Sequence, residues 1–302
     1  MSLLIILLGI AIDKFAESVE NIRKFDWFLR YSDWTRQQLE RWSLRNDTII
    51  LLIILLIPVL IIAFVYQRLD SALTLLGFLF SVAVFVFCIG PRDMHNRANK
   101  YVEALERGEE NTANTLVLEI LQDQPQPEEE SALIRKINET LLIATNNNFL
   151  GVVFWFVVLG PIGAVIFRLN QVLLKSLNQQ SMQPEPFDQE NAEPSTGFQQ
   201  SAQLLFCILN WIPSHLTAVT YAVTGSFVDA IHQWKVHRSY DNLDRNAANN
   251  MLIDTGFGAI QIEADNKVFD GQTIHDILGL CRRTMIVWIT VIAILTLAGW
   301  AA

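Results

Sequence analysis

The stretch from Thr48 to Tyr66, which reads TIILLIILLIPVLIIAFVY, decides the fold class because its nineteen positions carry no charge. An α-helix rises about 1.5 Å per residue, so this stretch nearly crosses a hydrocarbon core of roughly 30 Å. A second uncharged stretch, Ala72 to Pro91, follows the short polar segment Gln67 to Ser71. The pattern predicts a transmembrane hairpin over residues 48–91.

The composition of the whole chain agrees with a membrane protein. The 302 residues are 51% hydrophobic and 18% charged, whereas soluble domains contain about 25% charged residues. Further uncharged stretches predict spans at 149–169 and within the C-terminal segment 284–302. Residues 204–227 include Asn210, Pro213 and His215, so this segment is either a further span or a re-entrant helix. We predict an all-α polytopic membrane protein with at least four spans.

The remaining segments are polar. Residues 1–47 combine a short apolar stretch with an amphipathic pattern of Trp and Arg. This pattern suits an interfacial helix, and the alternative is a helix packed on its own domain. Residues 92–148 predict a cytoplasmic helical hairpin, residues 170–203 a flexible acidic linker, and residues 228–283 a second cytoplasmic segment. The seven Lys and Arg between Lys14 and Arg45 place the N-terminal region in the cytoplasm, because basic residues near spans favour that side.

Charge and motifs exclude several functions. The net charge of −9 is unlike the basic surface of a nucleic-acid-binding protein, so nucleic acid is not an expected partner. The lipid bilayer is the expected partner, because of the uncharged stretches. No P-loop, GxSxG, HExxH or EF-hand spacing is present, so we predict no catalytic motif. We also predict no metal site, because His232 and His237 lie five positions apart and would not share a helix face.

Polar residues at membrane depth are the candidates for a binding site, because a polar group there is costly and needs a partner or a task. Asn170, Asn210 and His215 lie within or beside apolar stretches, and Asp13 follows the first one. The alternative explanation is hydrogen bonding between helices. For Asp13 the alternative explanation is that the chain enters water at this residue.

Two segments carry a resemblance to a known family. They are NNNFLGVVFWFVVLGPIGAVIFRLN at Asn146 to Asn170 and NWIPSHLTAVTYAVTG at Asn210 to Gly225. With the basic pair before the last span, they resemble the AmpE family of membrane proteins, which is linked to β-lactamase induction. AmpE is in turn similar to the CobD/CbiB family, membrane enzymes that join an aminopropanol unit to adenosylcobyric acid using ATP. The resemblance implies a CobD/CbiB-like helical bundle with cytoplasmic helical segments.

The sequence departs from the synthase pattern where that family carries charge. Asn147 and Asn148 stand where its Asp-Gly falls, Leu173 replaces an Asp, and His215 replaces an Arg. Mg²⁺ is held chiefly by carboxylates and phosphates, so these changes weaken a Mg-ATP site. The resemblance therefore implies the synthase scaffold without its chemistry, and a pocket lined by Asp13, Asn147, Asn170, Asn210 and His215.

Three functions follow from this resemblance and from the residues. The first is a non-catalytic protein of the bacterial inner membrane that modulates β-lactamase induction and antibiotic resistance. It would bind muropeptide fragments from peptidoglycan recycling, or a membrane or cytoplasmic signalling partner, without a cofactor. The alternative is an ATP-dependent amide-forming ligase resembling adenosylcobinamide-phosphate synthase, which would need Mg-ATP. The third is a transporter of a cell-wall metabolite, although the sequence lacks the internal repeats typical of transporters.

Overall fold

The computed structural model describes residues 2–15, 25–41, 46–90, 93–121, 125–182, 197–238, 246–262 and 269–299. Within these ranges the chain forms helices and turns and no strand, which confirms the predicted all-α fold. Several helices are long and apolar enough to cross a membrane: α3 (Asp47–Ala72), the run Glu130–Gln180, α9 (Gly197–Thr224) and α12 (Gly271–Leu297). The protein is therefore an all-α polytopic membrane protein.

The helices divide between two compact units. Unit 1 contains α1 (Ser2–Phe15), α2 (Asp26–Arg41), α3, α4 (Thr74–Cys88), α8 (Gly151–Met182) and α9 as far as Leu209. Unit 2 contains α5 (Asp93–Glu106), α6 (Glu110–Leu121), α7 (Glu130–Thr145), the π-helix η2 (Asn146–Leu150), α9 from Asn210, α10 (Phe227–Arg238), α11 (Ala247–Ala259) and α12 as far as Ile294.

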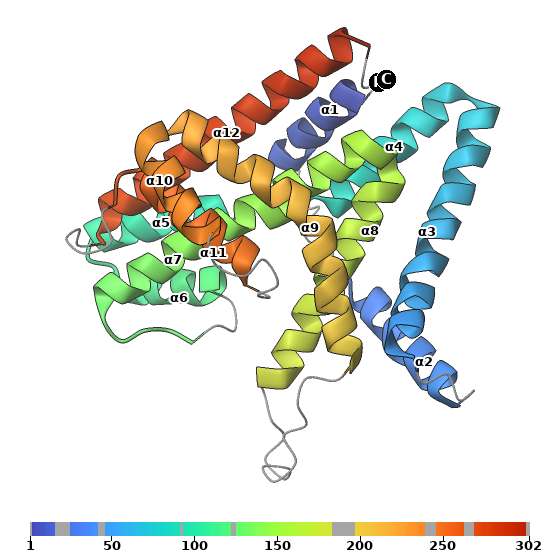
Figure 1. Ribbon diagram of the computed structural model, residues 1–302, viewed down its shortest axis with the longest axis horizontal. Coiled ribbons are helices and arrows are strands. Elements are labelled where there is room, and N and C mark those ends of the chain that lie inside the picture. The colour runs from blue at the N-terminus through green and yellow to red at the C-terminus, as the bar shows by residue number, and fades with distance from the viewer. Residues whose placement is uncertain are drawn as a thin grey trace. The chain divides into compact units, whose positions relative to one another are not determined.

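The predicted hairpin of unit 1 is made by α3 and α4, which meet at a sharp break (Figure 1). Asn46 caps α3, because its side-chain oxygen accepts hydrogen bonds from the backbone N–H of Thr48 (3.1 Å) and Ile49 (3.3 Å). The polar residues 67–71, where the sequence indicates a turn, continue α3 to Ala72, and the extended residue Leu73 alone separates the helices. None of residues 67–71 is Gly or Pro, so nothing there breaks the helix.

Helix α8 reverses its direction at Gly160. Gly160 has φ 66° and ψ −152°, a conformation open essentially to glycine alone, and Pro161 follows it. A Cβ on Gly151 would overlap the Phe167 ring, and one on Gly163 would overlap the backbone oxygen of Trp155. Residues 151–159 and 161–182 are therefore two helical arms packed against each other, and Figure 1 shows the ribbon turning back between them.

The prediction of a span over residues 149–169 does not include this reversal. Hydropathy reports where the chain is apolar, whereas the direction of the chain depends on the Gly160–Pro161 pair. The second arm continues to Met182, into the segment where a flexible linker is expected, and α9 begins at Gly197. The centre of that predicted linker, residues 183–196, lies outside the described residues.

Aromatic rings and small residues pack the helices of unit 1. The ring of Phe85 on α4 lies 4.8 Å from that of Phe156 on α8 and fills the space left by Gly9 on α1. Phe167 and Phe206 join α8 to α9 with their ring centroids 5.8 Å apart. This close packing suits a membrane environment, where contact between helices depends on small residues and shape.

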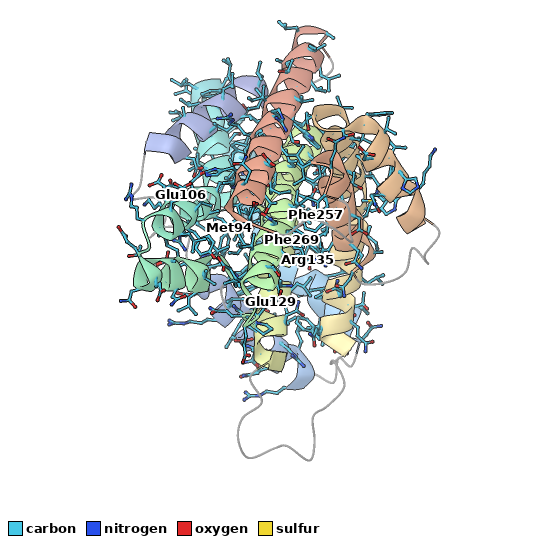
Figure 2. The ribbon with its side chains drawn as sticks, turned by 90° about the vertical axis from the view of Figure 1, so that its left-hand side faces the viewer. Met94, Glu106, Glu129, Arg135, Phe257 and Phe269 are labelled. Atoms are coloured by element: carbon cyan, nitrogen blue, oxygen red, sulfur yellow. The ribbon has the colours of Figure 1, made fainter. Side chains whose placement is uncertain are left out.

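Unit 2 has an apolar core made by side chains from many of its helices. Helices α5, α6, α7, α9, α10, α11 and α12 all contribute buried side chains to it. At one edge the rings of Phe257 and Phe269 are 5.5 Å apart, and the Arg135 guanidinium lies 5.8 Å from the Phe269 ring; these three residues lie together in Figure 2. This core supports the helices that carry the polar residues of α9 and η2.

Candidate functional site

The π-helix η2 interrupts the regular hydrogen bonding at the end of α7. Wide turns of this kind occur frequently at functional sites. The backbone oxygen of Asn148 accepts a hydrogen bond from the backbone N–H of Gly90 at 2.9 Å. Gly90 has no room for a side chain, since a Cβ there would overlap the Asn148 side chain. The π-helix is therefore held in place by a contact that requires glycine.

Asn146 is the centre of a buried hydrogen-bond network on η2. Its Nδ2 donates to Oδ1 of Asn210 (2.8 Å) and to Oδ1 of Asn147 (2.9 Å). Its Oδ1 accepts from the Thr217 hydroxyl at 2.9 Å. Asn146, Asn210 and Thr217 are each at most 1% exposed. We call Asn146, Asn147, Asn210 and Thr217 the asparagine site.

The sequence of α9 explains how its two members reach this site. Asn210 and Thr217 are seven positions apart, about two helical turns, so they share one face of α9. Tyr221 lies one turn further on that face, and its hydroxyl donates to the backbone oxygen of Leu142 at 2.9 Å. These hydrogen bonds fix α9 against α7 and η2.

The asparagine site keeps unused hydrogen-bonding capacity. Asn146 spends both of its amide hydrogens within the site, whereas Asn147 and Asn210 use only their oxygens there. The NH₂ groups of Asn147 and Asn210 donate to no residue that the structure describes. Asn147 is half-buried, so its NH₂ group is the donor that the site can offer to an oxygen-rich ligand, whereas Asn210 is only 1% exposed. The site carries no formal charge.

A second polar contact of unit 2 lies directly beside the site. The Thr145 hydroxyl donates to the backbone oxygen of Leu141 at 2.8 Å, so the His95 Nε2, 3.2 Å away, is the donor to Thr145. This contact joins α5 to α7 one residue before Asn146. His95 therefore supports the position of the site and is not one of its members.

Of the five residues predicted to line a pocket, the structure brings two together. Asn147 and Asn210 both contact Asn146. His215 lies five positions after Asn210, about 140° around α9. Its Nδ1 donates to the backbone oxygen of Trp211 at 2.7 Å, and its ring lies 4.6 Å from the Trp211 ring.

Asp13 and Asn170 belong to unit 1, whereas Asn147 and Asn210 belong to unit 2. Asn170 is fully buried in the second arm of α8, and its Nδ2 donates to the backbone oxygen of Ala202 at 3.3 Å. Its Oδ1 has no hydrogen-bond partner among the described residues. Asp13 is half-buried near the end of α1.

Three residues that the sequence analysis did not select have buried polar contacts. Asn146 and Thr217 complete the asparagine site, and the run of three asparagines directly before an uncharged stretch was the available signal. Arg168 is a buried arginine of unit 1, whose Nη1 donates to Oε1 of Gln171 at 2.7 Å and whose guanidinium lies 5.4 Å from the Phe25 ring. Nothing in its spacing distinguished Arg168 from a basic residue at the end of a span.

The donor set of the asparagine site suits neutral recognition better than metal binding. Its side chains are amides and a hydroxyl, and Mg²⁺ is held chiefly by carboxylates and phosphates. Among the residues that the structure describes, no three His, Cys, Asp or Glu side chains come together as a potential metal site. The site does not fit Mg-ATP.

The chain matches, over residues 1–301, the model of the family described as regulatory signalling modulator protein AmpE. Two proteins described as cobalamin biosynthesis protein CobD are also similar to it. The protein from Chromobacterium violaceum is 26% identical over 194 residues, which cover 64% of this chain and 57% of that protein. The protein from Stutzerimonas stutzeri is 26% identical over 165 residues, which cover 55% of this chain and 51% of that protein.

These matches confirm the family resemblance predicted from the sequence, including the relation to CobD. The matched part spans little more than half the length of the two relatives. No solved structure matches the chain significantly.

Proposed function

We propose a regulatory function for this chain. The proposal starts from the finding that the chain belongs to the family of the regulatory signalling modulator protein AmpE. In this proposal the protein is a multi-pass protein of the bacterial inner membrane with a cytoplasmic N-terminal region. It modulates β-lactamase induction by responding to fragments released in peptidoglycan recycling. It acts by binding a ligand, without catalysis.

The observation that supports this proposal most is the neutral, hydrogen-bonding character of the asparagine site. Muropeptide fragments carry peptide carbonyls, acetamido groups and sugar hydroxyls, all of which accept hydrogen bonds. The NH₂ group of the half-buried Asn147 supplies a donor of the matching kind. Because Asn146 holds this side chain in position, little side-chain freedom remains to be lost on binding.

The test is a direct binding measurement with a defined anhydro-muropeptide and the full-length protein in nanodiscs. Asn147 is half-buried, so Asn147→Ala removes its NH₂ donor without opening the core, and it also removes the Oδ1 that accepts from Asn146. The variant should lower affinity about five- to tenfold, as expected for the loss of a hydrogen bond of about 1 kcal/mol or slightly more.

The matched control is Asn114→Ala, which removes an exposed amide from α6 and should leave the affinity unchanged. Equal affinity in Asn147→Ala and the unmodified protein would remove the asparagine site from the proposal. No measurable binding of the muropeptide to the unmodified protein would remove the ligand class as well.

The similarity to the two CobD proteins supports a second candidate, an ATP-dependent amide-forming ligase. Such an enzyme would need a site for Mg-ATP, and the amides of the asparagine site lack the charge that Mg²⁺ requires. Transport of a cell-wall metabolite is the remaining candidate. A reconstituted flux assay that shows saturable uptake would favour transport over both other functions.

A further inference from the structure

The part of α9 within unit 2 carries an exposed apolar stripe. Its side chains recur at helical spacing and lie on one face of the helix: Ile212, Leu216, Val219 and Val223. The opposite face of α9 is buried against unit 2. In a helix that crosses a membrane, such a stripe faces the lipid chains.

The stripe continues into the first turn of α10. Phe227 is 57% exposed and Val228 is 76% exposed, although both are large apolar side chains. The first charge after the uncharged part of α9 is Asp229. The exposed apolar surface therefore extends beyond the end of α9 as far as Val228.

The turn between α9 and α10 is held rigidly, so this exposure is built into the fold. The backbone N–H of Ser226 donates to the backbone oxygen of Ala259 at 2.7 Å, and Gly225 has no room for a side chain against Ala259. Asp229 accepts from the Ser226 hydroxyl (2.5 Å) and from Gln261 Nε2 (3.1 Å). These hydrogen bonds lower the pKa of Asp229, with the Ser226 contact contributing most.

Helix α12 enters its uncharged stretch at the same level. The Thr224 and Thr284 hydroxyls are 3.1 Å apart, and the Trp288 Nε1 donates to the Thr220 hydroxyl at 3.2 Å. The two helices therefore run antiparallel in this register. Arg282 and Arg283 are the last charges before the uncharged stretch of α12. The polar boundaries of α9 and α12 thus coincide.

Both arginines are available to a ligand at this level. Arg282 and Arg283 are exposed, and neither forms an ion pair with a carboxylate of the described chain. A guanidinium group recognises phosphate through paired hydrogen bonds as well as charge. Two exposed arginines at the level where an exposed apolar surface ends therefore match the phosphate and the acyl chain of a phospholipid.

We propose that the α9–α10 turn and the start of the uncharged part of α12 form a binding surface for an anionic phospholipid. Arg282 and Arg283 contact its headgroup phosphate, and Val223, Phe227 and Val228 contact its acyl chains. A net negative headgroup is preferred because the two arginines exceed the charge of one phosphate. The surface does not involve the asparagine site, so the proposal stands independently of the ligand proposed above.

The test uses a fluorescent probe at an introduced cysteine in full-length protein reconstituted into proteoliposomes. Cys88 and Cys281 are at most 1% exposed, so the Cys207→Ser background leaves no accessible native thiol among the described residues. An NBD probe at Val228→Cys should be quenched by spin-labelled lipid and not by aqueous iodide. A probe at His232→Cys, an exposed position on the same helix, should be quenched by iodide.

The charge preference has its own comparison. Spin-labelled phosphatidylglycerol should quench the Val228→Cys probe at least twofold more than spin-labelled phosphatidylcholine. The double variant Arg282→Gln/Arg283→Gln should abolish this preference, whereas Arg107→Gln, which removes an arginine paired with Glu103, should keep it. Each of three results would overturn the proposal: quenching of the Val228 probe by iodide, its protection from both quenchers by a protein partner or a second copy, or an unchanged preference in the double variant.

Discussion

Unit 1 and unit 2 hold their helices together by different means. Unit 1 contains close contacts between rings and glycines, as where Gly151 faces Phe167 within α8. Unit 2 adds to its apolar core hydrogen bonds between side chains far apart in the sequence, as where Asn146 meets Asn210 and Thr217. The first kind of contact depends on shape, and the second depends on matched donors and acceptors.

This difference separates structural roles from binding roles. At a glycine contact, the neighbouring group fills the space beside the glycine, and the glycine has no side chain that could bind a ligand. A network of asparagines can satisfy its own members and still present a spare donor, as the half-buried Asn147 does. We therefore expect unit 1 to respond mainly to changes in side-chain volume and unit 2 mainly to changes in hydrogen bonding.

The largest effect should come from Gly163→Ala in unit 1. The added Cβ would overlap the backbone oxygen of Trp155, which cannot move aside without shifting the first arm of α8. We expect a loss of about 3 kcal/mol in the free energy of unfolding, the upper part of the usual range for overpacking. Thermal unfolding in detergent measures it.

Gly279→Ala is the matched control, because a Cβ at Gly279 in α12 meets nothing within 4 Å. That variant should be stabilised slightly, by about 0.5–1 kcal/mol, because alanine favours the helix. Equal unfolding temperatures for the two variants would contradict the close packing of the two arms.

A double-mutant cycle tests the network of unit 2. Thr217→Val leaves Oδ1 of Asn146 buried without its donor, and Asn146→Leu leaves the Thr217 hydroxyl without its acceptor. Each single change should cost about 1–3 kcal/mol of stability. The double variant should cost less than the sum by about 1 kcal/mol, because it removes both partners together. Strictly additive losses would show that the two side chains do not interact.

The spans and the reversal differ in how far the sequence predicts them. The uncharged stretch from Thr48 to Tyr66 predicts a membrane helix, because the length and apolar composition of a segment suffice to identify a span. The fold-back at Gly160 depends on one backbone conformation and on the fit of Gly163 against Trp155. This contact forms only after the chain has folded back, and hydropathy reports only how apolar each residue is. Hydropathy alone therefore does not reveal the contact.

The sequence also predicts the candidate site only in part. Asn147 and Asn210 stand out as polar residues beside apolar stretches, and the structure joins both to Asn146. His215 has the same signal, yet the rotation of α9 directs it to Trp211. Asn146 itself could not be distinguished from its two neighbours, because only the wide turn of η2 decides which asparagine faces α9.

The smallest effect concerns the rigid turn of unit 2. Hydrogen bonds from Ser226 and Gln261 lower the pKa of Asp229 in the folded protein from its ordinary value of 3.8. The stability that they contribute is therefore complete above the ordinary value and is lost as the pH falls through the lowered one. The unfolding temperature of the unmodified protein should exceed that of Asp229→Asn at neutral pH, and this difference should shrink below about pH 4. A difference that stays constant across this range would contradict the assignment.

The most direct test of the account is the thermal stability of the purified protein with a saturating anhydro-muropeptide and, separately, with saturating Mg-ATP. A ligand at 100 times its dissociation constant stabilises a protein by about 2.7 kcal/mol, which is plainly measurable. We predict an upward shift of the unfolding temperature with the muropeptide, a reduced shift in Asn147→Ala, and no shift with Mg-ATP. A shift with Mg-ATP and none with the muropeptide would contradict the account and favour the ligase.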